Sequence, residues 1–598
     1  MATTEIPVVR PDLRSSPRRV GRAALPSPGT LAAALVYVVA AFVILWPYLV
    51  HPTAVHIRRN EGDEYMFEWL LSVTAQSVTH LHNPLFSATV NAPMGINLAA
   101  NTGIIPLGIV FTPVTLLFGA AVSFGWILLG NLIATALVWR WFLGRQLPAS
   151  GSRAWRSLLV GFGGLALAFG PGMISHTLSH PNLTAQWLLP VIVDRVLRMR
   201  EGERLVRHGI VLGLLVTVQA FLSEELLFIT ALTLVVFMLC YAAQRPKQAW
   251  AQVPALARGI AVAVAVAGVL LAYPLWFQFA GPQSYPRIPD LPATHAADLK
   301  SFLLAPAQSI LGDPPVTRLY SPNYTEQESF LGWPLLVLTL LIALWRAWRD
   351  MVVRTCAMCV AVLAVLSWGP VPAFAKHSLG FHGLWYYIEA LPGFTDALPV
   401  RIALSVFPFM IVMALRNLLS AEREHVAIRG VAGIATMAAM VPLIATPVAV
   451  ADRDQIPQWV TSGEWQQCAG NGTVVTVPLV TDAYREPLRW VAQTRGALRI
   501  PQMPLFVPGP DGVATVGPVP RPTSELLARV DASGDVPAVM PKDEARLAAD
   551  LAYWNAGCVA VMPDAAHPQQ DQQMLTELFG RPGTLQGGVW TWKVGSDS

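Results

Sequence analysis

Apolar stretches as long as a membrane-spanning helix dominate this sequence from Thr30 to Val450. A helix needs about 20 apolar residues to cross a hydrocarbon core about 30 Å thick, and runs of that length recur between Arg-rich or Pro-rich interruptions. Only 13% of the 598 residues are charged, against about a quarter in soluble domains. The chain is therefore expected to be a polytopic α-helical membrane protein, with residues 30–450 as its transmembrane region.

The first apolar run, Leu31–Val50, follows a polar tail that carries five arginines. A secretory signal has a shorter apolar core and ends at a small-residue cleavage site, whereas this run ends in Trp46-Pro47-Tyr48. We therefore expect an uncleaved first span that is entered from a basic cytoplasmic tail, residues 1–29.

Lysines and arginines gather in alternate loops, and retained positive charge marks the cytoplasmic side of short loops. The pattern predicts about 11 spans, a cytoplasmic N-terminus and an extracytoplasmic C-terminal region. The segment Ile104–Phe118 is expected to lie in or dip into the outer leaflet, because a true span there would move the next basic cluster, Arg140 to Arg156, outside. Three longer segments are then outside: residues 51–101, 281–329 and 369–399.

The C-terminal region, residues 451–598, is charged and Pro-rich and has the periodicity of a soluble domain. It is expected to be a small extracytoplasmic α/β domain. The predicted strands are Gly472–Val480, Cys558–Met562 and Val589–Val594, and the predicted helices lie near Glu486–Gln493, Lys542–Asn555 and Asp571–Phe579.

Of the five cysteines, only Cys468 and Cys558 lie in this outside region. A pair in an oxidising compartment favours a disulfide, so we predict a bond between them. The alternative is two unpaired buried thiols.

The first outside loop holds an acidic segment, Glu61-Gly62-Asp63-Glu64, directly before an apolar helical pattern. A carboxylate held at a membrane surface can take a proton from an acceptor hydroxyl, which is the task of a general base. Asp63 and Glu64 are the catalytic candidates, with Glu61 beside them as a substrate-binding candidate. The alternative is that Asp63 caps a surface helix and the glutamates face water.

Several short segments form a pattern along the chain: Glu61–Glu64, Asn83–Phe86, Ala92–Leu98, Asn101–Thr102, Ser179–Leu183, Glu326–Gly332 and Leu391–Phe394. They resemble the outside loops of actinobacterial proteins similar to GT-C glycosyltransferases. The resemblance implies that an acidic residue after the first span is the base and that the donor is a polyprenyl-phosphate sugar. Asp63 lies farther from the first span than that acid usually does, so Glu61 or Glu64 could be the base instead.

Further polar residues of the predicted outside turns are substrate-binding candidates: His180, Asn182, Glu224 and Glu326. A neutral histidine can orient an acceptor hydroxyl or a donor phosphate, although a histidine in a turn is more often simply solvated. Acids such as Glu224 also favour the start of a helix for electrostatic reasons alone.

A lipid-phosphate donor needs a cation near the outer interface, because charge-assisted hydrogen bonds stabilise the phosphate. Arg401, which follows Leu398-Pro399-Val400, is the first candidate and Lys376 the second. The alternative for Arg401 is snorkelling to the interface. No cysteine or histidine spacing resembles a zinc motif, so no metal ligand is assigned. A divalent ion held by Asp63 and Glu64 with an outside histidine stays open.

We therefore expect a plasma-membrane glycosyltransferase of cell-envelope biosynthesis, which moves a sugar from a polyprenyl-phosphate donor to an extracytoplasmic glycan, lipid or protein, with inversion. The alternatives are a transporter or flippase for a lipid-linked or small polar substrate, or a membrane scaffold whose outer domain binds a glycan or a partner. A transporter more often has ionisable residues at mid-bilayer and repeated halves. The net charge of +4 is spread between apolar runs, which excludes nucleic-acid binding.

Overall fold

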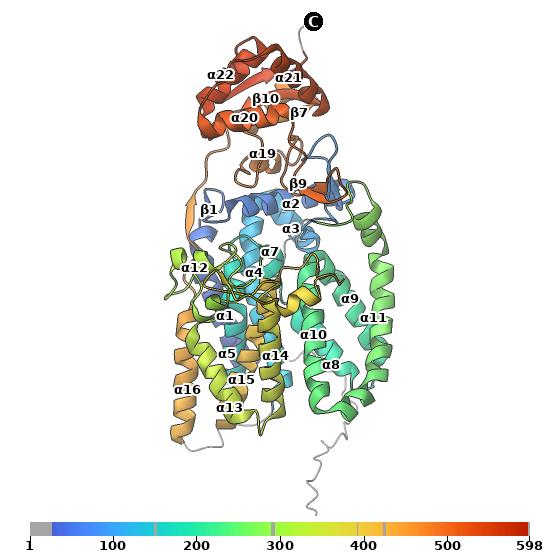
Figure 1. Ribbon diagram of the computed structural model, residues 1–598, viewed down its shortest axis with the longest axis vertical. Coiled ribbons are helices and arrows are strands. Elements are labelled where there is room, and N and C mark those ends of the chain that lie inside the picture. The colour runs from blue at the N-terminus through green and yellow to red at the C-terminus, as the bar shows by residue number, and fades with distance from the viewer. Residues whose placement is uncertain (1–26, 149–151, 289–293, 392, 422–425, 596–598) are drawn as a thin grey trace, which may run out of the picture.

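The computed structural model describes residues 27–148, 152–288, 294–391, 393–421 and 426–595. Figure 1 shows a bundle of helices, a layer that contains α2 lying across one end of the bundle, and a separate α/β unit beyond that layer.

Within the described residues, six helices are long and apolar enough to cross a membrane. Their outward surfaces carry exposed apolar side chains such as Leu35, Val264 and Val269, which are 65%, 64% and 78% exposed. An apolar surface of this kind requires a lipid environment, so the chain is a multi-pass membrane protein. The six are α1 (Pro28–Leu49), α4 (Ala120–Gln146), α9 (Leu205–Leu222), α10 (Glu224–Gln244), α11 (Pro246–Ala280) and the continuous helix formed by η3 (Pro399–Ser405) and α15 (Val406–Ala421).

Shorter helices complete the bundle, so the predicted count of about 11 spans is not established by helix length alone. Their bounds are α5 (Arg153–Ala168), α8 (Leu189–Met199), α13 (Trp333–Arg346), α14 (Met351–Ser367), α16 (Val426–Met440) and η4 (Val441–Leu443). Very short elements connect them: α6 (Pro171–His176), α7 (Pro181–Thr184), η1 (Leu299–Leu303), α12 (Pro314–Tyr320), η2 (Leu384–Tyr387), β2 (Phe86–Ser87), β3 (Ile96–Asn97), β4 (Ala373–Phe374) and β5 (His377–Ser378).

Helix α2 (Glu61–His80) lies across the end of the bundle (Figure 1). Three acidic residues lie in its first turn, where negative charge interacts favourably with the helix dipole and so stabilises the start of the helix. Large side chains such as Phe67 and Trp69 are fully buried, because the bundle covers α2 from below and the C-terminal region covers it from above. The segment predicted to lie in or dip into the outer leaflet forms a helix, α3 (Ile105–Phe118), which turns at Gly119 directly into α4.

The C-terminal unit is built on a four-stranded sheet of order β11-β12-β10-β7, in which β10 runs parallel to β7 and antiparallel to β12. Alternate residues of its central strands face opposite layers, as a period of two requires: Val475 and Val559 pack on α20, α21 and α22, whereas Val474 and Ala560 join the core that extends to α2. The strands are β7 (Thr473–Val477), β10 (Ala556–Val561), β11 (Thr584–Gln586) and β12 (Val589–Lys593), and the helices are α17 (Gln458–Thr461), α18 (Trp465–Ala469), α19 (Pro487–Gln493), α20 (Pro522–Ser533), α21 (Pro541–Tyr553) and α22 (Pro568–Phe579).

All three predicted strands and all three predicted helices of this unit are confirmed, as β7, β10 and β12 and as α19, α21 and α22. The sequence analysis did not identify α20, β11 or the hairpin of β8 (Phe506–Pro508) and β9 (Ala514–Val516). The predicted disulfide is present and joins Cys468 of α18 to Cys558 of β10. The C-terminal region is tied to the first outside loop by the pairing of β1 (Val55–Ile57), after the first helix, with β6 (Val450–Asp452), where the C-terminal region begins.

Candidate functional site

Asp63 lies in the first turn of α2, where α2 meets both the turn between α6 and α7 and the C-terminal region. Its Oδ2 lies 3.0 Å from Nε2 of His180, and its Oδ1 accepts a 2.7 Å hydrogen bond from Nη1 of Arg485. Asn60 ties the start of α2 to the same turn, because its amide donates to the carbonyl of Leu178 over 2.8 Å. Gly62 lets the Arg485 side chain lie close, since a Cβ there would be 3.1 Å from Arg485 Cδ.

The carboxyl group of Asp63 is ionised. Burial alone would raise its pKa, but the hydrogen bond and charge of His180 and the charge of Arg485 outweigh burial and hold the pKa well below its usual range. The Asp63 side chain nevertheless remains 24% exposed, so a hydroxyl group can approach it.

Next to His180 lies a second histidine, His176, which is fully buried. Nδ1 of His180 lies 3.3 Å from Nδ1 of His176, so the tautomers of the two rings are coupled. Burial lowers the pKa of His176 well below its usual value, which keeps this ring neutral. On its far side, His176 Nε2 lies 2.7 Å from Oε1 of Glu328. Burial, together with the charge of Glu326, raises the pKa of the Glu328 carboxyl well above its usual value.

Arg401 lies next to this cluster and is held by two carboxylates from different segments. Its guanidinium binds Glu326 through two bonds, Nε to Oε2 at 2.9 Å and Nη2 to Oε1 at 2.5 Å, and its Nη1 donates to Glu225. Burial opposes ionisation of Glu326, but the charge and hydrogen bonds of Arg401 hold its pKa below the usual range. The guanidinium is thus fixed at one position by the buried Glu326 and the half-buried Glu225.

Arg401 also borders a cavity of about 540 Å³. Its wall contains both polar residues and apolar residues, such as Phe228 of α10 and Leu271 of α11. A cavity with both kinds of wall suits an amphiphile. The charged or amide-bearing residues of its wall are Asn101, Asn182, Glu224, Glu225, Gln278, Arg287, Asp396 and Arg401.

The structure brings several of the predicted site residues together. Asp63 contacts His180, and Arg401 contacts Glu326. Asn182 and Glu224 line the same cavity as Arg401.

Three other candidates are placed differently. Glu64 turns away from His180: it accepts from the backbone amide of Ile57 over 2.8 Å and pairs with Arg453. Burial outweighs Arg453 and raises the pKa of Glu64 to about 8. Glu61 is exposed at the start of α2, and Lys376 is exposed in the turn between β4 and β5, outside the cavity wall.

The sequence analysis missed Arg485 and Glu328. Arg485 belongs to the loop before α19, and no local pattern there indicates a contact with α2. Glu328 lies two positions after Glu326 in the loop segment Glu326–Gly332, which carries part of the GT-C resemblance. This position in the segment was the one sequence signal for Glu328.

His176, His180 and Glu326 could hold a metal ion, because each offers one ligand atom and these atoms lie within 4.8 Å of one another. Two imidazoles and a carboxylate suit a divalent first-row ion such as Zn²⁺. Within the described residues, His176 Nε2 and both Glu328 oxygens are buried without a well-aligned hydrogen-bond partner. The ring nitrogen of His176 and the Glu328 carboxyl group, 2.7 Å apart, therefore fit a cation, whereas both oxygens of Glu326 already accept hydrogen bonds from Arg401. The spacing in the sequence did not predict a metal site.

No family model and no curated protein matches this sequence. Among solved structures, the arabinofuranosyltransferase AftD from Mycobacteria is similar, with a TM-score of 0.53 and 15% identity over 96% of this chain and 40% of AftD. This chain thus spans well under half the length of AftD. Two weaker likenesses have 10% identity. One is the Archaeoglobus fulgidus oligosaccharyltransferase in complex with Zn and sulfate, with a TM-score of 0.46 over 90% of this chain and 68% of that one. The other is AglB from the same organism with an inhibitory peptide and a dolichol-phosphate, with a TM-score of 0.45 over 92% of this chain and 71% of AglB. In fold, this chain resembles the GT-C membrane glycosyltransferases, as the loop motifs predicted.

Proposed function

We propose that the protein is a membrane glycosyltransferase that transfers a sugar from a polyprenyl-phosphate donor to an extracytoplasmic glycan, lipid or protein. One observation carries this proposal: the candidate base and the candidate phosphate-binding cation belong to one cluster. Asp63 binds His180, Arg401 binds Glu326, and ligand atoms of His180 and Glu326 lie within 4.8 Å of each other. The adjoining cavity of about 540 Å³ suits the lipid carrier.

In this reaction the acceptor hydroxyl attacks the anomeric carbon while the bond from that carbon to the lipid-phosphate oxygen breaks. Asp63 takes the hydroxyl proton, and Arg401 stabilises the negative charge of the departing phosphate. A single displacement inverts the anomeric centre. Because its pKa is low, Asp63 accepts the proton only once the attacking oxygen has become acidic in the transition state. The contacts with His180 and Arg485 fix the orientation of the carboxylate.

A divalent metal ion held by His176, His180 and Glu326 would add positive charge beside the donor phosphate. The residues of this chain would perform the other tasks: Arg401 orients the phosphate, and the fully buried His176 helps to exclude water.

The proposed topology has eleven passes: α1, α4, α5, α8, α9, α10, α11, α13, α14, α15 and α16. Six of these helices are long enough by themselves, and α8, with 11 residues, is the shortest. The N-terminal tail, residues 1–29, is then cytoplasmic, residues 30–450 form the transmembrane domain, and residues 451–598 are extracytoplasmic in the plasma membrane. In support, α2, whose first turn carries Asp63, and the C-terminal unit lie at the same end of the bundle (Figure 1).

The decisive experiment compares Asp63→Asn with Glu61→Gln in purified protein supplied with a polyprenyl-phosphate sugar donor. Loss of a positioned base is expected to lower transfer by about 100-fold or more, while Glu61, in the same helical turn but exposed, tolerates the change. Both variants are first checked for monodisperse elution and an unchanged melting temperature. If folded Asp63→Asn transferred sugar at the wild-type rate, Asp63 would not be the base.

A further inference from the structure

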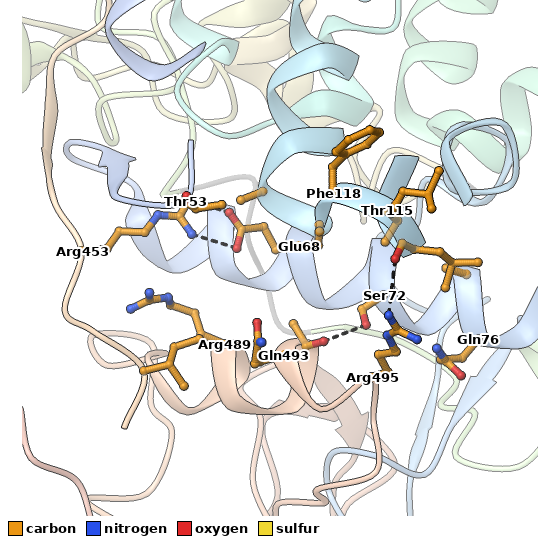
Figure 2. Close-up of a pocket in the computed structure, with 18 residues that line it drawn as sticks. Thr53, Glu68, Ser72, Gln76, Thr115, Phe118, Arg453, Arg489, Gln493 and Arg495 are labelled. Atoms are coloured by element: carbon orange, nitrogen blue, oxygen red, sulfur yellow. Dashed lines mark hydrogen bonds and ion pairs between the residues drawn. The ribbon is translucent and has the colours of Figure 1, made fainter. Parts of the chain in front are cut away.

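A second cavity, of about 340 Å³, lies beside α2 and shares no lining residue with the larger one. Figure 2 shows its three walls. Ser72 and Gln76 come from α2, and the corner between α3 and α4 contributes residues 115–121. The segment from Arg489 to Arg495, which includes the end of α19, closes the third side.

The walls of this pocket are rich in guanidinium groups. Arg453, Arg489 and Arg495 line it, and Glu68 is the only acid among the described lining residues. Arg453 is neutralised, since it binds Glu68 (Nη1 to Oε2, 3.0 Å; Figure 2) and also Glu64. Arg489 donates to the carbonyl of Asp454 over 2.9 Å and pairs with Glu486, which does not line the pocket. Among the described lining residues, the arginine without a carboxylate partner is therefore Arg495.

Arg495 is the cation best placed to bind a ligand. Its Nη2 donates to the carbonyl of Leu116 over 3.3 Å, and it is exposed. A single carbonyl uses one of the five N–H donors of a guanidinium, and among the described residues no carboxylate forms a salt bridge with Arg495. Its backbone has φ 53° and is followed by Gly496 at φ 77°. Residues with side chains rarely adopt this left-handed conformation, and such strain is common at binding sites.

Apolar side chains surround the mouth of the pocket. Leu117 and Phe118 line it and are 74% and 64% exposed, and Val110 on α3 is 70% exposed. The pocket therefore lies where the lipid-facing apolar surface meets an arginine-rich surface. A ligand that fits both parts has an anionic head and an apolar tail.

We propose that this pocket binds the phosphate headgroup of a membrane lipid, with Arg495 as the principal ligand and with Leu117 and Phe118 against the acyl chains. A planar guanidinium binds phosphate oxygens through paired hydrogen bonds, and the Gln76 and Gln493 amides line the same pocket as further donors. The bound lipid joins the α3–α4 corner to α19. This site is separate from the proposed donor cavity and does not depend on glycosyl transfer.

The test uses the full-length protein in nanodiscs that contain phosphatidylglycerol or, instead, diacylglycerol with the same acyl chains, and native mass spectrometry after detergent extraction. Wild type is expected to retain phosphatidylglycerol but not diacylglycerol, and Arg495→Gln to retain about tenfold less, equivalent to about 1.4 kcal/mol. Arg495→Lys keeps the charge without the fork and is expected to retain an intermediate amount. Arg529→Gln, an exposed arginine of α20, is the matched control.

Inorganic phosphate tests whether the pocket binds free phosphate instead of the phosphate of a lipid headgroup. It is expected to compete with phosphatidylglycerol only at high concentration. Phe118→Asn is expected to weaken lipid retention without changing the affinity for inorganic phosphate itself. Equal retention of lipid by wild type and folded Arg495→Gln would overturn the site. Tight, Arg495-dependent phosphate binding without any lipid retention would overturn the lipid assignment.

Discussion

Arg485 Nη1 donates to Asp63 Oδ1 across 2.7 Å and so joins two side chains that lie 422 positions apart in the chain. The first is in the initial turn of α2, and the second is in the loop that enters α19. The hydrogen bond and charge of His180, and then the charge of Arg485, hold the pKa of Asp63 below its usual range, so a residue of the C-terminal region contributes to the ionisation of the candidate base. The C-terminal unit is thus part of the site and not an appendage to it.

Removing this cation is expected to raise the pKa of Asp63. In Arg485→Gln the base becomes protonated at a higher pH, so transfer is lost on the acid side of the pH–rate profile where wild type still works. Initial rates of sugar transfer between pH 4 and 7 measure the shift. Asp482→Asn is the control, since Asp482 bonds to the other amino group of Arg485 at 3.1 Å and is 67% exposed. An unchanged acid limb in folded Arg485→Gln would contradict the assignment of Asp63.

Arg401 neutralises two carboxylates, those of Glu225 and Glu326. Arg401→Met leaves both without their partner and is expected to lower the free energy of unfolding by about 3–5 kcal/mol. Adding Glu326→Gln should restore part of that loss, because an amide tolerates burial better than an unpaired anion. Thermal unfolding in detergent measures both variants. Equal melting temperatures for wild type and Arg401→Met would show that the ion pairs contribute nothing to stability.

Chelator-washed protein is expected to take up about one Zn²⁺ per chain if His176, His180 and Glu326 act together as a closed ligand set. His176→Ala should weaken this uptake at least about tenfold, as measured by metal content after dialysis, a readout that does not need activity. His208→Ala on α9 serves as the control, since it lies outside the ligand group. Undiminished uptake by His176→Ala would place the metal elsewhere.

The disulfide between Cys468 and Cys558 closes a loop with a sequence separation of 90. A loop of this length is expected to contribute about 4–5 kcal/mol through the lost entropy of the unfolded chain. The double variant Cys468→Ala/Cys558→Ala should therefore lower the melting temperature of the C-terminal unit, and reductant should do the same to wild type. Reductant should have no further effect on the double variant.

Asp571, in the first turn of α22, is fully buried. Burial, followed by the charge and hydrogen bond of Asp531, raises its pKa to about 7. The unfolded chain releases this proton near pH 4, so between about pH 4 and 7 the folded state binds more protons and stability falls as pH rises. Asp571→Asn should remove this decline and raise the melting temperature at pH 8 by several degrees. If the melting temperatures of variant and wild type changed in the same way between pH 4 and 8, the role of Asp571 in this pH dependence would be refuted.

Local features of the sequence were sufficient for the class of the protein and for much of its secondary structure. Helix α3 was predicted to within one residue and β10 to within two, because the length and period of an apolar run depend on neighbours along the chain. The cysteine pair followed from the predicted compartment. The GT-C-like fold was recognised from short loop motifs, and the fold comparison agrees with it.

The sequence alone determined that the chain is a multi-pass membrane protein and that Asp63, His180, Arg401 and Glu326 are polar residues in its loops or at helix ends. Only the tertiary structure decided which of them meet. Asp63 and Glu64 are adjacent, but successive helical residues point about 100° apart, so Asp63 faces His180 while Glu64 faces Arg453. Which partner each carboxylate contacts depends on the surfaces that pack above and below α2. Segments distant in the sequence supply those surfaces, including the loop that carries Arg485.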